Sequence, residues 1–443
     1  MLTRFSKGTI VAMMLAIAAF SSCTARNSET PRNSEGEREP QSAQASTPNR
    51  MMRTEVLDPQ PIRVDLAQMP QPNQVETASK PPQVVPIPDN PVLRVPAGFT
   101  VNVFAEGLDR PRWLAMTPNG DVLVTETREN RIMLLQHRDG VVFSRRPFAT
   151  AENGLNLPFG MTFAGDSFFV GNTDAVLRFP YANNQISGRG EKITELPGQG
   201  YNQHWTRNVV ASPDGQKLYV SVGSRSNADE EPLPRASIQV MNLDGSDRRT
   251  FASGLRNPVG LDFNPATGTL FATVNERDQL GDGLVPDYLT QVQAGEFYGW
   301  PYAYLTPDRL DPRHLKADGK SIRPDLAAKT RTPDVLFEAH SAALGLRFYT
   351  GNTFPEKYRN GAFVAFRGSW NRSQGTGYKI VFVPFREGRP EGQYEDFLTG
   401  FLLDPKVPTT WGRPVGLLVL NDGSLLFTDE ANNRIYRIQY AAK

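Results

Sequence analysis

Short apolar runs alternate with polar turns along the chain beyond residue 91. Each copy of the pattern has a polar opening, a short apolar run, a turn with Gly, Asn or Asp, and a second run rich in β-branched and aromatic residues. This pattern predicts paired β-strands joined by hairpin turns. The equivalent position of the pattern recurs six times, at Trp113, Gly160, Val210, Gly260, Gly345 and Gly416.

The spacing of these positions indicates the fold class. Consecutive steps are 47, 50, 50, 85 and 71 residues. A repeat of about fifty residues made of paired strands is typical of a β-propeller with one sheet per blade. We therefore predict an all-β, six-bladed β-propeller over residues 91–443, with insertions near residues 278–339 and in the fifth blade. A β-sandwich, the alternative, would not explain one element repeated six times.

The first 90 residues do not follow this pattern. Residues 1–23 contain basic residues, an apolar run and then Cys23, the only cysteine of the chain, so they predict a secretory signal. Small residues before that cysteine resemble a bacterial lipoprotein signal, with a plain cleaved signal as the alternative. Residues 24–90 are rich in Pro, Gln and Ser and lack aromatics, which predicts a disordered linker. We expect an exported, periplasmic protein held at the bacterial membrane by lipidated Cys23.

The charge balance narrows the class of partner. Lys and Arg total 48 against 47 Asp and Glu, a formal net charge of +1. A nucleic-acid binder usually shows a basic excess, so we expect no nucleic-acid partner. A single cysteine also excludes an intramolecular disulfide and a cysteine-based metal cluster.

Candidate site residues gather where the repeated strands begin. The glycines of the repeats are expected to lie nearest the central axis, where sheets converge. The loops that enter these strands then ring one mouth of the central channel, a concave place that ligands favour. The polar residues in or beside those loops are Arg112, His204, Arg207, Arg256, Asn257, His340, Arg367 and Arg413.

Two residue types in this ring have defined chemistry. The ordinary pKa of histidine lies near neutral pH, so His204 is the candidate proton acceptor, with a packed surface-loop histidine as the alternative. Several arginines at one mouth suit a ligand with several carboxylates, because a guanidinium can bind a carboxylate through two hydrogen bonds. Each arginine taken singly could equally be a solvated strand-end residue.

Four motifs resemble the soluble quinoprotein sugar and aldose dehydrogenases, in particular their sorbosone dehydrogenase-like branch. They are His204-Trp-Thr-Arg-Asn208, Gly254-Leu-Arg-Asn-Pro-Val-Gly-Leu261, Gly295-Glu-Phe-Tyr-Gly-Trp-Pro301 and His340-Ser-Ala-Ala-Leu-Gly345. The resemblance covers residues 94–440. It implies a six-bladed propeller that uses pyrroloquinoline quinone (PQQ) and calcium to oxidise an aldose or sugar aldehyde such as sorbosone.

The resemblance also implies roles for single residues. His204 matches the catalytic base, which takes a hydroxyl proton while hydride passes to the quinone. Arg256 and Asn257 match the pair that holds the cofactor, and Arg367 and Arg413 match partners of its carboxylates. The remaining implied positions are the backbone carbonyls of Glu276 and Arg277 as calcium ligands, with Arg112, Arg207 and His340 as further cofactor-binding residues.

The chain departs from the glucose-oxidising members beside the histidine. Those enzymes carry an aspartate just before it and a second one on a later strand, where this chain has Gln203 and approximately Ser224. An acidic partner would fix the tautomer of the imidazole and raise its basicity. The acidic run 229–231 lies downstream and could substitute. His340 has no equivalent in those enzymes.

Two other functions remain open at this stage: a calcium-dependent lactonase on a similar scaffold, and a non-catalytic carbohydrate-binding propeller. The resemblance favours a dehydrogenase with a small sugar substrate. No haem-attachment motif occurs in the chain, so the electron acceptor is expected to be a separate partner.

Overall fold

The computed structural model describes residues 50–198 and 203–441. The predicted signal, Cys23 and residues 24–49 of the predicted linker lie outside the described residues. Within the described part, strands dominate, and the longest helix is the four-residue α1 (Pro324–Ala327). None of the described helices has the length and apolar character needed to cross a membrane.

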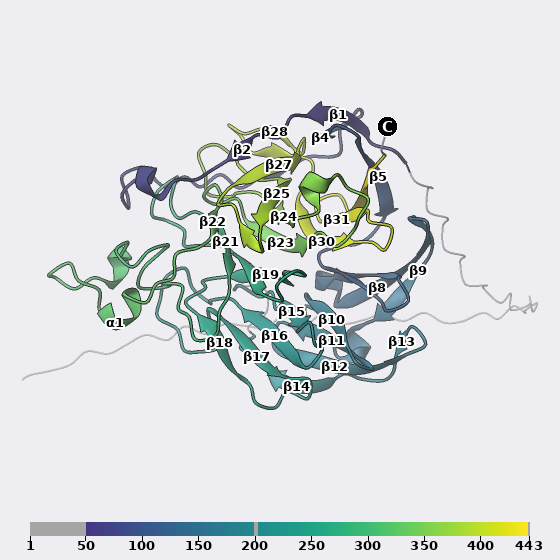
Figure 1. Cartoon of the computed structure of the whole chain (residues 1–443), viewed down its shortest axis with the longest axis horizontal. Helices are drawn as coiled ribbons and strands as arrows, with labels where there is room; N and C mark the ends of the chain where they lie inside the picture. Colours follow the sequence, from purple (N-terminus) through teal and green to yellow (C-terminus); the bar gives the residue numbers. More distant parts are fainter. Residues whose placement is uncertain (1–49, 199–202, 442–443) are drawn as a thin grey trace, which may run out of the picture. The chain divides into compact units, whose positions relative to one another are not determined.

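Six antiparallel sheets form the main body of residues 91–441, and each follows one of the six repeats (Figure 1). The first sheet contains β6 (Leu114–Met116), β7 (Val122–Glu126), β8 (Arg131–Arg138) and β9 (Val141–Ala149). The second contains β10 (Met161–Ala164), β11 (Ser167–Asn172), β12 (Ala175–Ala182) and β14 (Glu191–Glu195). The third contains β15 (Val209–Ala211), β16 (Lys217–Val222), β17 (Ser237–Asn242) and β18 (Arg249–Ser253).

The fourth sheet contains β19 (Pro258–Phe263), β20 (Leu270–Val274), β21 (Tyr288–Gln291) and β22 (Val335–Leu336). The fifth contains β23 (Ala343–Phe348), β24 (Gly361–Phe366), β25 (Lys379–Arg386) and β27 (Tyr394–Leu398). The sixth contains β30 (Pro414–Val419), β31 (Leu425–Asp429), β32 (Arg434–Tyr440) and β5 (Phe99–Glu106). The sixth sheet joins both ends of this part of the chain, because β5 pairs with β32.

The first strands of the six sheets contact one another in a circle. The neighbouring pairs are β6–β10, β10–β15, β15–β19, β19–β23, β23–β30 and β30–β6. The repeat glycines make this approach possible, since a Cβ on Gly260 would lie 2.3 Å from Leu344 O and one on Gly416 2.2 Å from Arg112 O. The predicted propeller architecture, with its glycines beside the neighbouring inner strand, is confirmed.

Shorter elements decorate the sheets. They are β4 (Val92–Pro96), β13 (Gln185–Ile186), β26 (Arg389–Pro390), β28 (Leu402–Asp404), β29 (Thr409–Thr410), η2 (Thr127–Glu129), η3 (Ala151–Asn153), η4 (Pro312–His314) and η5 (Glu356–Tyr358). The predicted insertion near residues 278–339 supplies β21 and β22 of the fourth sheet and, between them, η4 and α1. The 85-residue spacing between the fourth and fifth repeats therefore reflects an insertion between two strands of the fourth blade.

Residues 50–90 correct the prediction of a disordered linker. β1 (Arg53–Leu57) pairs with β4, β2 (Pro61–Ile62) with β27, and β3 (Gln83–Val84) with β29, while η1 (Leu66–Gln68) forms a single turn. The segment has little apolar surface of its own, so composition alone indicates disorder. Strand edges of the fifth sheet and of the short strands β4 and β29 offer backbone groups, and the segment pairs with them.

Candidate active site

The floor of the site is a ring of apolar side chains, one from each blade. This cluster consists of Trp113, Phe159, Trp205, Val259, Leu344 and Val415. These residues come from the starts of the inner strands or the loops that enter them. The floor confirms that these loops converge on one funnel, as predicted from the repeat.

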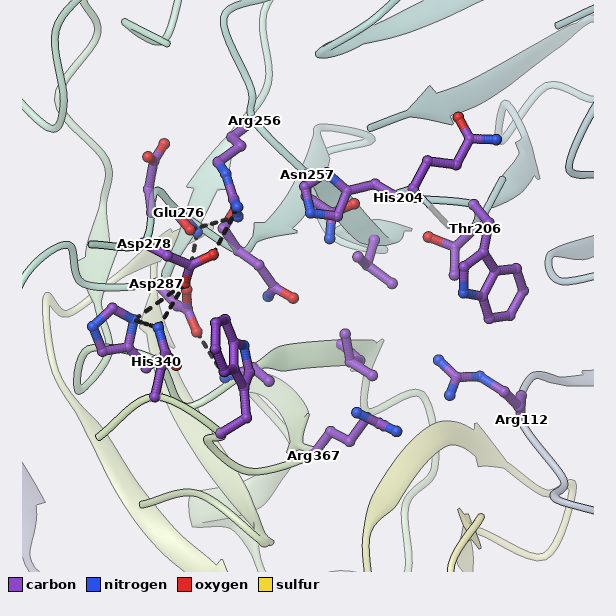
Figure 2. A pocket seen from close by; sticks show the side chains of 18 residues that line it. Arg112, His204, Thr206, Arg256, Asn257, Glu276, Asp278, Asp287, His340 and Arg367 are labelled. Atoms are coloured by element: carbon purple, nitrogen blue, oxygen red, sulfur yellow. Dashed lines mark hydrogen bonds and ion pairs between the residues drawn. The ribbon is translucent and has the colours of Figure 1, made fainter. Parts of the chain in front are cut away.

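A cavity of about 220 Å³ opens above this floor (Figure 2). Six of the predicted ligand-binding and catalytic side chains line it, together with Glu276. These six are Arg112, His204, Arg256, Asn257, His340 and Arg367. Residues far apart in the sequence are thus brought to one place by the circular order of the blades.

A second cavity of about 290 Å³ adjoins the first and shares Arg112, Trp205 and Arg367 with it. Arg413 lines this second cavity with Glu430. The Arg413 guanidinium donates to the carbonyls of Arg367 and Gly368, each at 3.2 Å. Burial and the nearby charge of Arg367 lower the pKa of Arg413 to about 10. Such crowding of positive charge favours an anionic ligand.

Ser224 orients His204. The distance from His204 Nδ1 to Ser224 Oγ is 3.0 Å, and Ser224 Oγ lies 2.6 Å from the carbonyl of Ser226. Because the single hydroxyl hydrogen of Ser224 donates to that carbonyl, its oxygen accepts from Nδ1–H of His204. The imidazole therefore keeps its lone pair on Nε2, which is the form that a proton acceptor needs.

The acidic run 229–231 does not substitute for the missing aspartate. Asp229 pairs with Arg313, and Glu230 accepts from the hydroxyl of Tyr302 at 2.5 Å. Glu231 accepts from the backbone amides of Arg225 and Ser226. All three carboxylates are engaged elsewhere, and a neutral hydroxyl partners His204 instead.

The pKa of His204 lies well below its ordinary value of 6.5, because burial and then the nearby Arg256 guanidinium disfavour the imidazolium. A base must be unprotonated to accept a proton, and a lowered pKa keeps His204 neutral at pH 6.5. We therefore expect the acid limb of kcat/KM to lie below pH 6.5 in the wild-type protein.

Replacing Ser224 with Asp should move that acid limb to higher pH, since a carboxylate favours the imidazolium and raises its pKa. The pH dependence of kcat/KM measures the shift. Ser187→Asp, at an exposed position between β13 and β14, controls for the added charge. An unchanged limb in Ser224→Asp would show that His204 is not the titrating base.

Arg256 is the centre of a polar network on one side of the cavity. Its guanidinium donates to Asp278 Oδ2 at 2.8 Å, to the Glu276 carbonyl at 2.6 Å and to Asn227 Oδ1 at 3.0 Å. The neighbouring Asn257 has a buried Oδ1 with no hydrogen-bond partner among the described residues. That oxygen lies against Gly223, and Asn257 lines the cavity, so its role in cofactor binding stays a prediction.

Glu430 is the centre of a second network, on another side of the funnel. Its carboxylate forms ion pairs with both Arg112 and Arg367. The arginines around it hold the pKa of Glu430 well below its ordinary value despite the opposing effect of burial. Three arginines surround this one carboxylate: Arg112, Arg367 and Arg413. The group therefore carries two positive charges in excess, which favours an anionic ligand.

Arg207 does not belong to the cavity, which corrects its predicted role in cofactor binding. Its side chain is completely buried and donates to the carbonyls of Pro197, His204 and Thr206. The residue shares a motif with His204 because it braces the loop that carries the histidine.

The two carbonyls predicted to bind calcium both accept hydrogen bonds from the protein. Glu276 O accepts from Arg256, and Arg277 O accepts from the amide of Val285 at 3.3 Å. The Arg277 side chain pairs with Asp311, away from the cavity. No three His, Cys, Asp or Glu side chains in residues 50–198 and 203–441 form a group able to hold a metal. Each carbonyl thus already accepts one hydrogen bond, and calcium binding by these two carbonyls stays a prediction.

Carboxylates surround this position instead. Burial raises the pKa of Glu276 to about 8 and that of Asp287 to about 7. Asp278 accepts from Arg256 and from Asn371 Nδ2 at 2.8 Å. Of this acidic group only Glu276 was predicted from the sequence, and only for its carbonyl. Asp278 and Asp287 were missed because they occupy no repeat position.

His340 lines the cavity as predicted and supports its neighbours. Asn371 Nδ2 lies 3.2 Å from His340 Nδ1, so this nitrogen accepts and Nε2 carries the proton toward the carbonyl of Gly281 at 3.5 Å. Burial lowers the pKa of His340, which keeps the imidazole neutral. The sequence alone gives no signal for Asn371, which reaches the site from the insertion of the fifth blade.

Comparison with known proteins identifies the family. The family model described as TrAA12-like matches residues 93–441. The chain belongs to the TrAA12-like family. This membership confirms the predicted resemblance at the level of the family, and none of the matches described below distinguishes the sorbosone dehydrogenase-like branch.

Relatives of this TrAA12-like chain include an uncharacterized protein of Borreliella burgdorferi, 29% identical over 363 residues that cover 79% of this chain and 91% of the relative. The pyrroloquinoline quinone-dependent pyranose dehydrogenase of Coprinopsis cinerea is 25% identical over 333 residues. That match covers 66% of this chain but only 45% of the Coprinopsis enzyme.

Solved structures support the fold of the TrAA12-like chain. The AA12 enzyme of Trichoderma reesei has a TM-score of 0.67 at 20% identity, covering 81% of this chain and 99% of that structure. The PQQ domain of the Coprinopsis pyranose dehydrogenase has a TM-score of 0.65 at 22% identity, covering 80% and 98%. At these identities the likeness concerns the fold.

Proposed function

We propose that this protein is a PQQ-dependent dehydrogenase that oxidises an aldose or sugar aldehyde, with sorbosone as one candidate, and that His204 is its general base. The observation that carries the proposal is a neutral imidazole, with its lone pair on Nε2, in a cavity lined by arginines. The relatives named as PQQ-dependent sugar dehydrogenases support the same class of chemistry.

The residues present fit PQQ, a planar group with three carboxylates. The two adjoining cavities together have arginines on two sides. Arg256 lies on one side, and Arg112, Arg367 and Arg413 lie around Glu430 on the other. Asn257 lines the cavity and supplies a polar contact, and the apolar floor supplies a surface for a ring system. Arg112, Arg367 and Arg413 would hold the carboxylates through charged hydrogen bonds. The N–H groups of Arg256 already donate to Asn227, Glu276 and Asp278, so Arg256 would contribute its positive charge.

When bound, PQQ supplies a two-electron acceptor for the hydride that leaves the substrate carbon. His204 Nε2 takes the proton from the hydroxyl on that carbon, so a carbonyl forms as the O–H and C–H bonds break. Ser224 keeps Nδ1 protonated and so keeps Nε2 free for this proton. The positive charge of Arg256 then helps the imidazolium release the proton to solvent, because it disfavours the charged ring.

The remaining proposals rest on sequence alone. We propose export through the signal at residues 1–23, anchoring at Cys23, action in the periplasm and transfer of electrons to a separate acceptor. Calcium stays a prediction.

The decisive experiment is a titration of the purified apoprotein with PQQ, followed by an aldose panel with an artificial dye acceptor. We expect saturable uptake and dye reduction with an aldose. We also expect at least tenfold weaker uptake in Arg256→Ala, because a positive charge beside the ligand carboxylates is lost. Parallel titrations with calcium and with a chelator test the predicted ion.

Absence of uptake would contradict the proposal. A lactonase assay would then test the hydrolase alternative. Uptake that is equal in wild type and Arg256→Ala would remove Arg256 from the cofactor site.

A further inference from the structure

Trp370 is an exposed aromatic residue in a site where the other aromatic side chains are packed. Its side chain lines the first cavity, and the residue is 45% exposed. Trp205, the other tryptophan of this cavity, is 7% exposed and packs against Phe159 and Arg112. The indole of Trp370 has no ring, cation–π or hydrogen-bond partner among residues 50–198 and 203–441.

The backbone that carries this indole is nevertheless firmly held. The flanking residues Ser369 and Asn371 are each 1% exposed. Asn371 donates to Asp278, and the amide and hydroxyl of Ser373 donate to Asp282 at 2.5 and 2.6 Å. A loop that is fixed on both sides of an exposed indole presents that ring at low cost in conformational entropy on binding.

Residues 73–85, which we call the strap, also hold the loop that carries Trp370. Its Lys80 amide donates to the carbonyl of Trp370 at 2.8 Å, and Lys80 Nζ donates to the carbonyls of Ser373 at 2.9 Å and Lys406 at 3.2 Å. At its start, Asn73 N donates to Leu280 O at 2.7 Å, and at its end Val85 N donates to Thr410 O at 2.9 Å. The strap thus ties three segments beside the cavities to one another.

We propose that Trp370 is a substrate-contacting residue that stacks on the apolar face of a pyranose ring, and that Lys80 of the strap is its positioning residue. An exposed indole at the mouth of a polar cavity marks a ligand contact. A sugar ring presents C–H groups on one face and hydroxyls at its edge, so it can lie on the indole while its hydroxyl reaches His204. This inference rests on the proposed function for its substrate class.

The test uses the full chain in two measurements. The first is saturation-transfer NMR of methyl pyranosides with the apoprotein, which reports sugar contact without any cofactor. The second is the steady-state kinetics of the PQQ-loaded protein with an aldose. We expect Trp370→Ala to lose most of the transfer signal and to raise KM about tenfold, with kcat and PQQ affinity unchanged.

Two further variants test the contact and its positioning, and two others are controls. Trp370→Phe should recover most of the affinity, because a smaller aromatic face remains. Lys80→Met should raise KM about threefold, because the platform is held less firmly. Phe143→Ala removes another exposed aromatic, and Lys316→Met removes another exposed ammonium; both should behave as wild type.

An unchanged transfer signal and KM in Trp370→Ala would overturn the inference. If the apoprotein gives a Trp370-dependent signal but takes up no PQQ, the sugar contact stands and the proposed dehydrogenase fails. A Trp370→Ala variant that loses PQQ affinity with no change in sugar contact would assign the indole to the cofactor and would also overturn the inference.

Discussion

His204→Gln is expected to lower kcat by about 100- to 10,000-fold, the usual contribution of a positioned general base. Glutamine has a similar reach but cannot accept a proton at neutral pH. The fold and the uptake of PQQ should persist, since His204 lies in a loop and the apolar floor does not depend on its ring. Stopped-flow reduction of the PQQ-loaded protein by an aldose measures the chemical step directly.

The control for this variant is His137→Gln. His137 lies on β8, and its Nε2 lies 3.0 Å from the carbonyl oxygen of Gly120; neither residue lines the cavity. The His137→Gln variant should reduce the dye acceptor at the wild-type rate. Equal loss in both histidine variants, or full activity in His204→Gln, would contradict the assignment of the base.

Glu430→Gln should destabilise the apoprotein by about 3–5 kcal/mol, the typical cost of breaking a buried ion pair by removing one partner. Its side chain is 10% exposed and pairs with Arg112, whose side chain is 9% exposed, as well as with Arg367. Without the carboxylate, three arginines would face one another uncompensated. Urea unfolding at neutral pH measures the loss of unfolding free energy.

The pH dependence gives a second readout for Glu430. Its pKa is lower in the folded state than its ordinary value of 4.5, so the ionised carboxylate stabilises the fold above pH 4.5. This contribution is lost as the pH falls through the lowered folded-state pKa. Glu430→Gln lacks that dependence, so its stability should fall less steeply in acid than that of the wild type.

Glu191→Gln is the matched control for Glu430→Gln. Glu191 pairs with Arg178 at 2.6 Å, but its side chain is 58% exposed. Surface pairs contribute about 0–1 kcal/mol, so this variant should unfold nearly as the wild type does. A loss in Glu430→Gln no greater than in this control would show that the arginine cluster does not depend on Glu430.

The repeat made the fold readable from the sequence. Six copies of a strand pair with its turn residues, four of them with a glycine at the equivalent inner-strand position, allow few architectures other than a propeller. The convergence of His204, Arg256 and Arg112 follows from the same repeat, because equivalent loops of a closed ring meet on its axis. Local pattern and global fold agree here, which is why the prediction succeeded.

The partners of these residues could not be predicted in this way. Ser224 and Glu430 reach the site from positions that the repeat does not single out. Asn371 comes from an insertion, and insertions have no periodicity to interpret. Arg207 illustrates the opposite error, since a residue next to His204 in sequence proved to face the protein interior. Neighbours in a loop can point in opposite directions, and only packing decides which one meets the cavity.

The sequence by itself determined the class of fold, the order of the strands and the convergence of one histidine and four arginines around a central funnel. It did so because strand periodicity, turn chemistry and small inner-strand residues are local properties that repeat. The tertiary structure alone decided the tautomer of His204, the pairing of Glu430 with Arg112 and Arg367, and the order of residues 50–90. Those features depend on hydrogen bonds and ion pairs between distant segments, and a polar segment without a core of its own folds only when another part of the chain supplies the strand edges on which it lies.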